Sequence, residues 1–191
     1  VVPELASRDH QKNILLTVKT ALKLANIELK QLDVIAVTQG PGLMGSLLVG
    51  ISFAKSLALS LQIPIITVNH MQGHILAHLI NEGENKIPEF PFLCLTVSGG
   101  HTQLVEVTSA LNFKIIGTTI DDAVGEAFDK AAKIIGLPYP GGPLIDKHAQ
   151  KGNPNKFKFA TAKTENYNYS FSGIKTSFLY FINDNLKQNK D

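Results

Sequence analysis

The fold of this chain is decided by Val34-Ile-Ala-Val-Thr-Gln-Gly-Pro-Gly-Leu-Met-Gly45 and by the segment that continues from it to Val68. The stretch begins with a short apolar run at 34–37, which predicts a strand, and passes into a glycine-rich turn at 40–45. A mostly apolar helix is expected at 47–61 and a second strand at 63–68. Strand, turn, helix and strand in this order form a βαβ unit, so the sequence predicts an α/β fold with part of its sheet parallel.

The same stretch is long enough to cross a membrane, and Lys55 is its only charge between Gly40 and Asn69. In a membrane span Lys55 would lie near the middle, at a cost of roughly 2.5–3.5 kcal/mol. Serines also dilute the apolar run. We therefore favour a helix buried in the core of an α/β protein, and we expect no membrane contact.

The pattern changes after a polar connector at 81–88, which marks a seam between two lobes. Short apolar runs separated by turns follow it and indicate an antiparallel meander. The expected strands are 92–97, 102–107 and 114–118, and the expected helices are 9–27, 70–81, 122–135, 143–152 and 172–186.

Composition limits the classes of function. The chain has 191 residues, of which 44% are hydrophobic, so it has ample material for a core. Its net charge of +2 is too small for avid non-specific nucleic-acid binding, although a shaped RNA site remains open. Arg8 is the only arginine, so phosphate contacts would come from lysine and backbone N–H groups. The single cysteine, Cys94, lies in an apolar run and is expected to be a buried thiol, and with no signal peptide visible the chain is expected to be intracellular.

The turn Gly40-Pro-Gly-Leu-Met-Gly45 has the spacing of a dinucleotide-binding loop. Such loops need an acidic residue at the end of the next strand, where this chain has Asn69. Pro41 also removes one donor N–H from the turn. We therefore favour a tight turn that lets a helix pack closely on a strand over a nicotinamide or flavin site.

Three of the six histidines, His70, His74 and His78, follow one another at intervals of four residues. On a helix they form one stripe, and residues i and i+4 can share one metal ion. His70 and His78 would lie about 12 Å apart along the axis, too far for one ion. The spacing therefore predicts a metal site at 70/74 or at 74/78 and does not choose between them. The residue after His70 is Met71, so the pattern is not that of a zinc peptidase, which has glutamate there.

Two further groups of residues could bind a ligand. The turn Thr96-Val-Ser-Gly-Gly-His-Thr-Gln103 is either an ordinary hairpin or a cradle of N–H groups for phosphate, and spacing favours neither. Asp121 and Asp122 precede a helix, and at least one of them is expected to cap it. Asp129 could pair with Lys133 on an exposed face. The rigid Tyr139-Pro-Gly-Gly-Pro143 loop, with Asp146 after it, would allow a ligand to approach the backbone closely.

Several motifs occur together in a fixed order and carry a resemblance. They are Val1-Val-Pro-Glu-Leu-Ala-Ser-Arg-Asp-His10, Gly40-Pro-Gly42, His70-Met-Gln-Gly-His74, Val97-Ser-Gly-Gly-His-Thr-Gln103, Asp121-Asp-Ala-Val-Gly-Glu-Ala-Phe-Asp-Lys130, Tyr139-Pro-Gly-Gly142 and Ser170-Phe-Ser-Gly-Ile-Lys-Thr176. Together they resemble the TsaD family of tRNA N6-adenosine threonylcarbamoyltransferases, formerly called glycoproteases or O-sialoglycoprotein endopeptidases, in its bacterial and organellar form.

The resemblance implies an actin-like ATPase fold with two α/β lobes. Residues 1–88 would be the remainder of the N-terminal lobe, and residues 89–191 the first part of the C-terminal lobe. It implies transfer of threonylcarbamoyl from threonylcarbamoyl-adenylate to N6 of the adenosine beside the anticodon, in tRNAs that read codons starting with A. It implies one divalent metal ion, iron or zinc, held by His70 and His74, and a nucleotide ligand, threonylcarbamoyl-adenylate or ATP. The residues that would contact this ligand are Thr96, Val97, Ser98, Gly99, Gly100, Asp129, Gly142 and Asp146.

The resemblance also carries expectations about partners and completeness. A TsaB-like partner of the same fold and a TsaE-like ATPase are implied, with tRNA as substrate and a cytoplasmic or organellar location. Family members extend beyond both ends of this chain, so we expect a fragment that is inactive alone. Two alternatives remain open at this point: a non-catalytic scaffold or dimerisation partner of the same fold, and a metallopeptidase. The paired histidines argue against the first, and the missing glutamate argues against the second.

Overall fold

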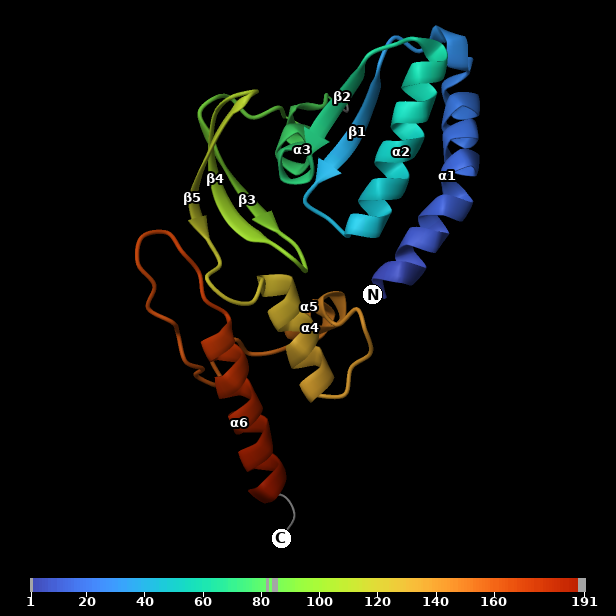
Figure 1. Ribbon diagram of the computed structural model, residues 1–191. Coiled ribbons are helices and arrows are strands. Elements are labelled where there is room, and N and C mark those ends of the chain that lie inside the picture. The colour runs from blue at the N-terminus through green and yellow to red at the C-terminus, as the bar shows by residue number, and fades with distance from the viewer. Residues whose placement is uncertain (1, 82, 84–85, 189–191) are drawn as a thin grey trace. The chain divides into compact units, whose positions relative to one another are not determined.

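The computed structural model describes residues 2–81, 83 and 86–188 and divides into two compact units, Val1–Ile80 and Asn81–Asp191. The chain runs through the first unit before it enters the second (Figure 1). The division falls at the start of the polar connector expected at 81–88. The identification of the two units with parts of two actin-like lobes stays a prediction.

The first unit is built around the expected βαβ unit. Strand β1 (Ile35–Gly40) pairs in parallel with β2 (Ile65–Asn69), and α2 (Met44–Leu61) connects them. Helix α1 (Pro3–Ala25) packs against α2, and η1 (Leu29–Gln31) leads from α1 into the sheet. Helix α1 begins six residues earlier than its apolar spacing predicted, because Pro3 stands in its first turn, where a missing N–H costs nothing. The predicted parallel pairing is confirmed.

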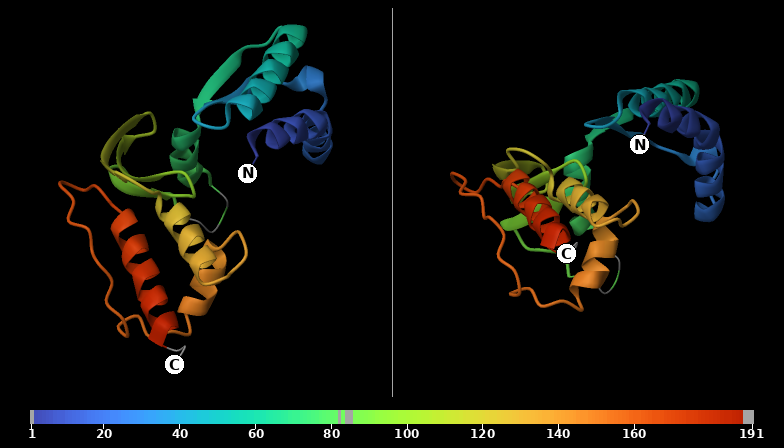
Figure 2. Two further views of the ribbon diagram at one scale, coloured as in Figure 1. Left: turned by 60° about the horizontal axis from the view of Figure 1, so that its bottom comes forward. Right: turned by 90° about the horizontal axis from the view of Figure 1, so that it is seen from below.

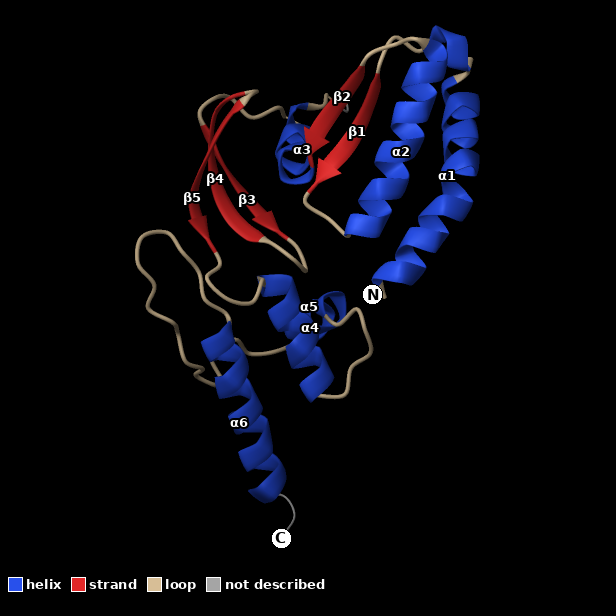
Figure 3. Ribbon diagram, viewed as in Figure 1, coloured by secondary structure: helices blue, strands red, loops and turns tan. Residues whose placement is uncertain are grey.

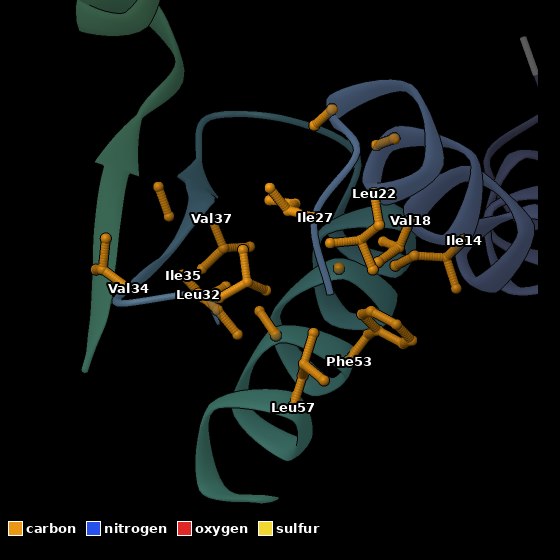
Figure 4. Close-up of a pocket in the computed structure, with 15 residues that line it drawn as sticks. Ile14, Val18, Leu22, Ile27, Leu32, Val34, Ile35, Val37, Phe53 and Leu57 are labelled. Atoms are coloured by element: carbon orange, nitrogen blue, oxygen red, sulfur yellow. The ribbon is translucent and has the colours of Figure 1, made fainter. Parts of the chain in front are cut away.

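An apolar hollow of about 460 Å³ lies between α1, α2 and β1. Figure 4 shows Ile14, Val18 and Leu22 of α1 facing Phe53 and Leu57 of α2 across it. The apolar spacing that predicted α1 therefore marks the face that packs on α2.

Helix α2 is less enclosed than expected. Only Ala54 and Ala58 of its 18 residues are buried, while Leu48 and Leu59 are 56% and 81% exposed. The expectation of a buried core helix is wrong to this extent, because α1 and β1 cover only part of its circumference. By length and composition α2 could cross a membrane, which is weak evidence by itself.

Packing explains the glycines of the turn that leads into α2. A Cβ on Gly45 would overlap the Ser7 hydroxyl of α1, and a Cβ on Gly42 would lie 3.4 Å from the Leu47 side chain. Glycine therefore lets α2 approach α1 and its own turn closely, whereas the tight-turn interpretation predicted close packing of the helix on a strand.

The second unit contains the predicted meander. Strands β3 (Phe92–Val97), β4 (Thr102–Ser109) and β5 (Asn112–Thr118) pair antiparallel in that order. One face is buried and holds Cys94, Thr96, Val105 and Val107, whereas Leu93 and its neighbours at every second position of β3 are exposed. The predicted burial of Cys94 as a free thiol is confirmed.

Three helices follow the meander: α4 (Val124–Ile134), α5 (Gly142–Ala149) and α6 (Ser172–Gln188). Both α5 and α6 contact α4, and α6 lies beside α4 in both views of Figure 2. The apolar face predicted for α4 packs toward α6 and encloses a cavity of about 310 Å³ with it. A long irregular connection joins α5 to α6, as Figure 3 shows.

Candidate functional site

The first unit brings two of the three striped histidines together. Helix α3 (His70–Leu76) carries His70 and His74, whose Nε2 atoms lie 2.8 Å apart with their ring centroids at 4.7 Å. His78 lies in a separate 3₁₀ turn, η2 (Ala77–Leu79), so the stripe does not continue on one α-helix. Of the two pairings that spacing left open, the structure forms 70/74.

The residue before the helix positions this pair. Asn69 ends β2, and its Oδ1 accepts hydrogen bonds from the N–H groups of Met71 at 2.9 Å and Gln72 at 3.2 Å. An asparagine cap of this kind fixes the first turn of a helix. His70 is the first residue of that turn, so the strand end and the cap together determine where both imidazoles lie.

The pair fits two ligands of a metal ion. Zinc–nitrogen bonds of about 2.0–2.1 Å place adjacent ligand atoms about 3 Å apart, close to the observed separation. Both histidines are exposed, so an ion could reach them. In the part of the chain that the structure describes, no third His, Cys, Asp or Glu joins them. The residues present therefore supply two donors of a site that needs at least one more, and their metal role stays a prediction.

The second unit holds the glycine turn between β3 and β4. The Ser98 N–H donates to the His101 carbonyl at 2.9 Å, and the N–H groups of His101 and Gly100 donate to Ser98 Oγ at 3.0 and 3.3 Å. Ser98 thus closes the turn from inside, and Gly99 and Gly100 form its exposed tip. Thr96 is buried in β3, so of the predicted ligand contacts in 96–100 the accessible ones are at the tip and at Val97, which is 54% exposed.

The turn lies directly on the start of α4. The Gly125 N–H donates to the Ser98 carbonyl at 3.3 Å, and the Val124 N–H donates to Thr102 Oγ1 at 2.9 Å. A Cβ on Gly125 would lie 2.7 Å from the Ser98 carbonyl oxygen and 2.9 Å from the Gly99 nitrogen. Only glycine allows this approach, which brings the positive end of α4 to the glycine tip. Among the hydrogen bonds of the described residues the Gly99 N–H has no acceptor, so it is the tip group that could bind an anion beside the start of α4.

Asp129 holds the second glycine loop. Its Oδ1 accepts hydrogen bonds from the N–H groups of Gly141 at 2.8 Å and Gly142 at 3.2 Å. The structure therefore brings two predicted ligand residues, Asp129 and Gly142, into contact. The predicted Asp129–Lys133 pair is wrong for the residues described, because the carboxylate is directed to the loop. Asp146 lies exposed on α5 and accepts from Gln150 Nε2 at 3.3 Å.

Asp121 and Asp122 do not cap the helix that follows them. Helix α4 begins at Val124 after Ala123, with no side-chain cap, so the expected cap is wrong. Asp121 instead accepts hydrogen bonds from Ser170 Oγ and from the N–H groups of Phe171 and Ser172, at the start of α6. Desolvation raises the pKa of Asp121, but these three hydrogen bonds outweigh it and leave the pKa below its usual value.

Asp122 links α4 to α6 through two lysines. Its carboxylate lies 2.8 Å from Lys130 Nζ and 2.7 Å from Lys175 Nζ. Hydrogen bonds from Lys130 and then Lys175 lower the pKa of Asp122. The hydrogen bond to Asp122, followed by the one to Glu126, raises the pKa of Lys130. This ion-pair network joins segments more than 50 residues apart, and nothing in local spacing predicted it.

The residues that sequence reasoning missed are Thr102, Gly125 and Gly141, which hold the predicted ligand residues in place. Thr102 is 2% exposed, and a Cβ on Gly141 would overlap the Ala132 side chain. All three occur within motifs that carried the resemblance. What was lacking was knowledge of which segments pack on one another.

A parallel βαβ unit followed by an antiparallel meander with helices defines the chain as an α/β protein. A family model described as TsaD, tRNA N6-adenosine threonylcarbamoyltransferase, matches residues 1–189. The chain belongs to this family, whose members have the actin-like ATPase fold.

Curated relatives agree with this assignment. The chain is 61% identical over 191 residues to a relative from Christiangramia forsetii, covering 100% of this chain and 56% of the relative. It is 60% identical to one from Riemerella anatipestifer, covering 99% of this chain and 55% of the relative. A third, from Phocaeicola vulgatus, is 58% identical and is covered to 57%. All three are named tRNA N6-adenosine threonylcarbamoyltransferase, and the chain spans just over half their length.

Among solved structures, YeaZ from Pseudomonas aeruginosa gives a TM-score of 0.40 at 15% identity, covering 93% of this chain and 78% of that one.

Proposed function

We propose that the protein carrying this chain transfers the threonylcarbamoyl group from threonylcarbamoyl-adenylate to N6 of the adenosine beside the anticodon of tRNAs that read codons starting with A. The observation that carries the proposal is the family match over residues 1–189, with relatives at 58–61% identity that bear this name.

The second unit offers residues suited to the adenylate. The Gly99 N–H at the tip of the Ser98–His101 turn, beside the start of α4, would donate to the phosphate. Asp129 uses one carboxylate oxygen for the Gly141–Gly142 loop, which leaves the other for a hydroxyl of the nucleotide. Gly142 and Asp146 complete the proposed nucleotide contacts.

The transfer needs no nucleophile from the protein. Adenosine N6 would form a bond to the carbonyl carbon of the threonylcarbamoyl group, and the bond from that carbon to the adenylate phosphate oxygen would break. Adenylate leaves with the electron pair, and N6 loses a proton. The task of the chain is therefore to orient two substrates and to neutralise the leaving phosphate.

His70 and His74 would hold a divalent metal ion, iron or zinc. Bound there, the ion would supply Lewis-acid polarisation of the donor's reactive end. The same pair disfavours the alternative of a non-catalytic scaffold, which has no use for metal ligands. Met71 in place of glutamate disfavours the alternative of a metallopeptidase.

By the same resemblance, we propose a TsaB-like partner, a TsaE-like ATPase and a cytoplasmic location. Family membership supports these three proposals.

The test is a transfer assay with the protein as its source cells make it, with its natural termini. Purified protein, threonylcarbamoyl-adenylate and an unmodified tRNA that reads codons starting with A should yield threonylcarbamoyladenosine, detected by mass spectrometry of nucleosides. His74→Ala should lose bound metal, measured by elemental analysis, and His78→Ala should keep it. Equal metal content in the two variants would sink the ligand assignment. Absence of modified nucleoside with the unaltered protein would sink the function.

A further inference from the structure

A group of lysines on the second unit is not used by any contact described above. We name Lys147, Lys151, Lys156, Lys158 and Lys163 the lysine strip. No Asp or Glu occurs between residues 147 and 164. Of the chain's 18 basic residues the strip takes five, so 13 remain elsewhere against 16 acidic residues, a net charge of −3. The positive charge of the chain is therefore concentrated in the strip.

All five lysines are exposed. Among the residues that the structure describes, none of them makes an ion pair, whereas Lys130 and Lys175 are both bound to Asp122. The strip therefore keeps its charge available to an external anion.

Aromatic packing holds part of the strip in place. Phe157 and Phe159 alternate with Lys156 and Lys158, and their rings lie 4.6 and 5.5 Å from that of Phe181 on α6. Phe159 also contacts Phe178, and the Ala160 N–H donates to Ser177 Oγ at 3.2 Å. The connection between α5 and α6 is thus anchored by its phenylalanines, and Lys156 and Lys158 beside them are exposed, with Lys156 Nζ 5.3 Å from the centroid of the Phe157 ring.

The strip begins on the helix that starts at the candidate nucleotide loop. Gly142 is the first residue of α5 and Lys147 lies five residues further, about 8 Å along the axis. A polyanion on the strip would therefore lie next to the loop that Asp129 holds.

We propose that the lysine strip is a docking surface for the sugar-phosphate backbone of the tRNA substrate. Five exposed lysines with no acidic residue among them in the sequence offer the positive charge that a chain of phosphates attracts, and with a single arginine in this chain the contact made by this surface depends on lysine. The inference rests on the proposed function and assigns the surface that holds the tRNA.

The experiment is tRNA binding by the protein with its natural termini, measured by fluorescence anisotropy over a series of salt concentrations. The probe is an unmodified tRNA transcript that reads codons starting with A. In the first variant Lys156, Lys158 and Lys163 become Gln, and in the second the same three become Arg. A matched control changes the exposed Lys19, Lys23 and Lys55 of the first unit to Gln, which alters net charge equally.

The Gln strip variant should bind tRNA about 10- to 100-fold more weakly near physiological salt. The slope of the logarithm of its binding constant against the logarithm of salt concentration should fall in magnitude by about 2–3, because each of the three lost phosphate contacts contributes about 0.7–0.9. The Arg variant and the matched control should stay near the unaltered protein. Equal affinity and slope in the Gln strip variant and the matched control would overturn the inference while leaving the proposed function intact. The same proteins are also tested for binding to phosphatidylserine vesicles. If the Gln strip variant binds these vesicles more weakly than the unaltered protein does, while its tRNA binding is unchanged, the inference is overturned in favour of a membrane surface. If the unaltered protein neither binds nor modifies tRNA, both proposals fall.

Discussion

The two units hold their candidate site residues by different means. In the first, His70 and His74 lie four residues apart on α3, and the neighbouring Asn69 sets them in place. In the second, the Ser98–His101 turn rests on α4, which begins more than 20 residues later. The first arrangement is local and the second depends on packing between distant segments. The same kind of substitution should therefore have local effects in one unit and spreading effects in the other.

The largest expected effect is that of Gly125→Ala. Its Cβ would lie 2.7 Å from the backbone oxygen of Ser98, so the turn or the helix must move. Overpacking of this kind costs about 1–3 kcal/mol. Denaturant unfolding should show this loss, and the KM for the adenylate should rise. The matched control is Gly173→Ala in α6, where a Cβ meets nothing within 4 Å and the helix should gain about 0.5–1 kcal/mol. Equal behaviour of the two variants would mean that the turn does not rest on α4.

A somewhat smaller effect is expected for Thr102→Val, which keeps the shape of the side chain and removes the acceptor of the Val124 N–H. Leaving that partly buried donor unpaired should cost about 1–3 kcal/mol. Thr102→Ser keeps the hydroxyl acceptor, so its free energy of unfolding should stay much closer to that of the unaltered protein. Hydrogen exchange at Val124 measures the effect directly, and unchanged exchange in the Val variant would contradict the assignment.

Asp121→Ala should cost about 1–2 kcal/mol, because it removes the side chain that caps α6 from a distance. Asp184→Ala, in the same helix but without such contacts, should stay within about 0.5 kcal/mol. The comparison is a pair of thermal unfolding curves. If both variants melt alike, the cap contributes nothing.

The pH dependence of this effect has a definite sign. The pKa values of Asp121 and Asp122 are lowered in the folded protein, so the unfolded chain takes up protons more readily. The stability that these carboxylates add is present above the usual value of 3.8 and is lost as pH falls through the lower folded values. The difference in the free energy of unfolding between the unaltered protein and Asp121→Asn should therefore become smaller as the pH is lowered. A gap that widens on acidification would reverse the assigned sign.

The smallest effect is expected in the first unit, where the candidate site residues are held by local contacts. Asn69→Ala should cost about 1 kcal/mol and should raise hydrogen exchange at Met71 and Gln72 without altering β1 or α1. Asn69→Asp should keep the cap. Changes that spread through the first unit would break the contrast between the two units.

This contrast also explains what the sequence could predict. The βαβ unit, the meander and the four-residue spacing of His70, His74 and His78 depend on residues close in the chain, and periodicity found them, although the spacing did not choose between 70/74 and 74/78. The cap at Asp121, the packing at Gly125 and the start of α4 were missed or wrong, because each depends on a partner from 20 to 50 residues away. The exposure of α2 was misjudged for a related reason: an apolar composition does not say how many neighbours a helix has. The assignment of ligand and metal roles rested on resemblance throughout.

The contacts between residues 118–122 and 168–175 have a consequence for the order in which the second unit forms. Besides Asp121 and Asp122, Thr118 and Ile120 bond to Asn168 and Tyr169, so several contacts close one loop of about 50 residues. Closing such a loop costs about 3.5 kcal/mol of chain entropy, and that cost arises once however many contacts form. Chain entropy therefore opposes the first contact, whereas each later contact adds stability without a further closure cost. The contacts between the two segments should therefore form and break together. Residues 118–122 leave the ribosome before residues 168–175, so the loop between them, which carries the lysine strip, can be closed only after the second segment has been synthesised.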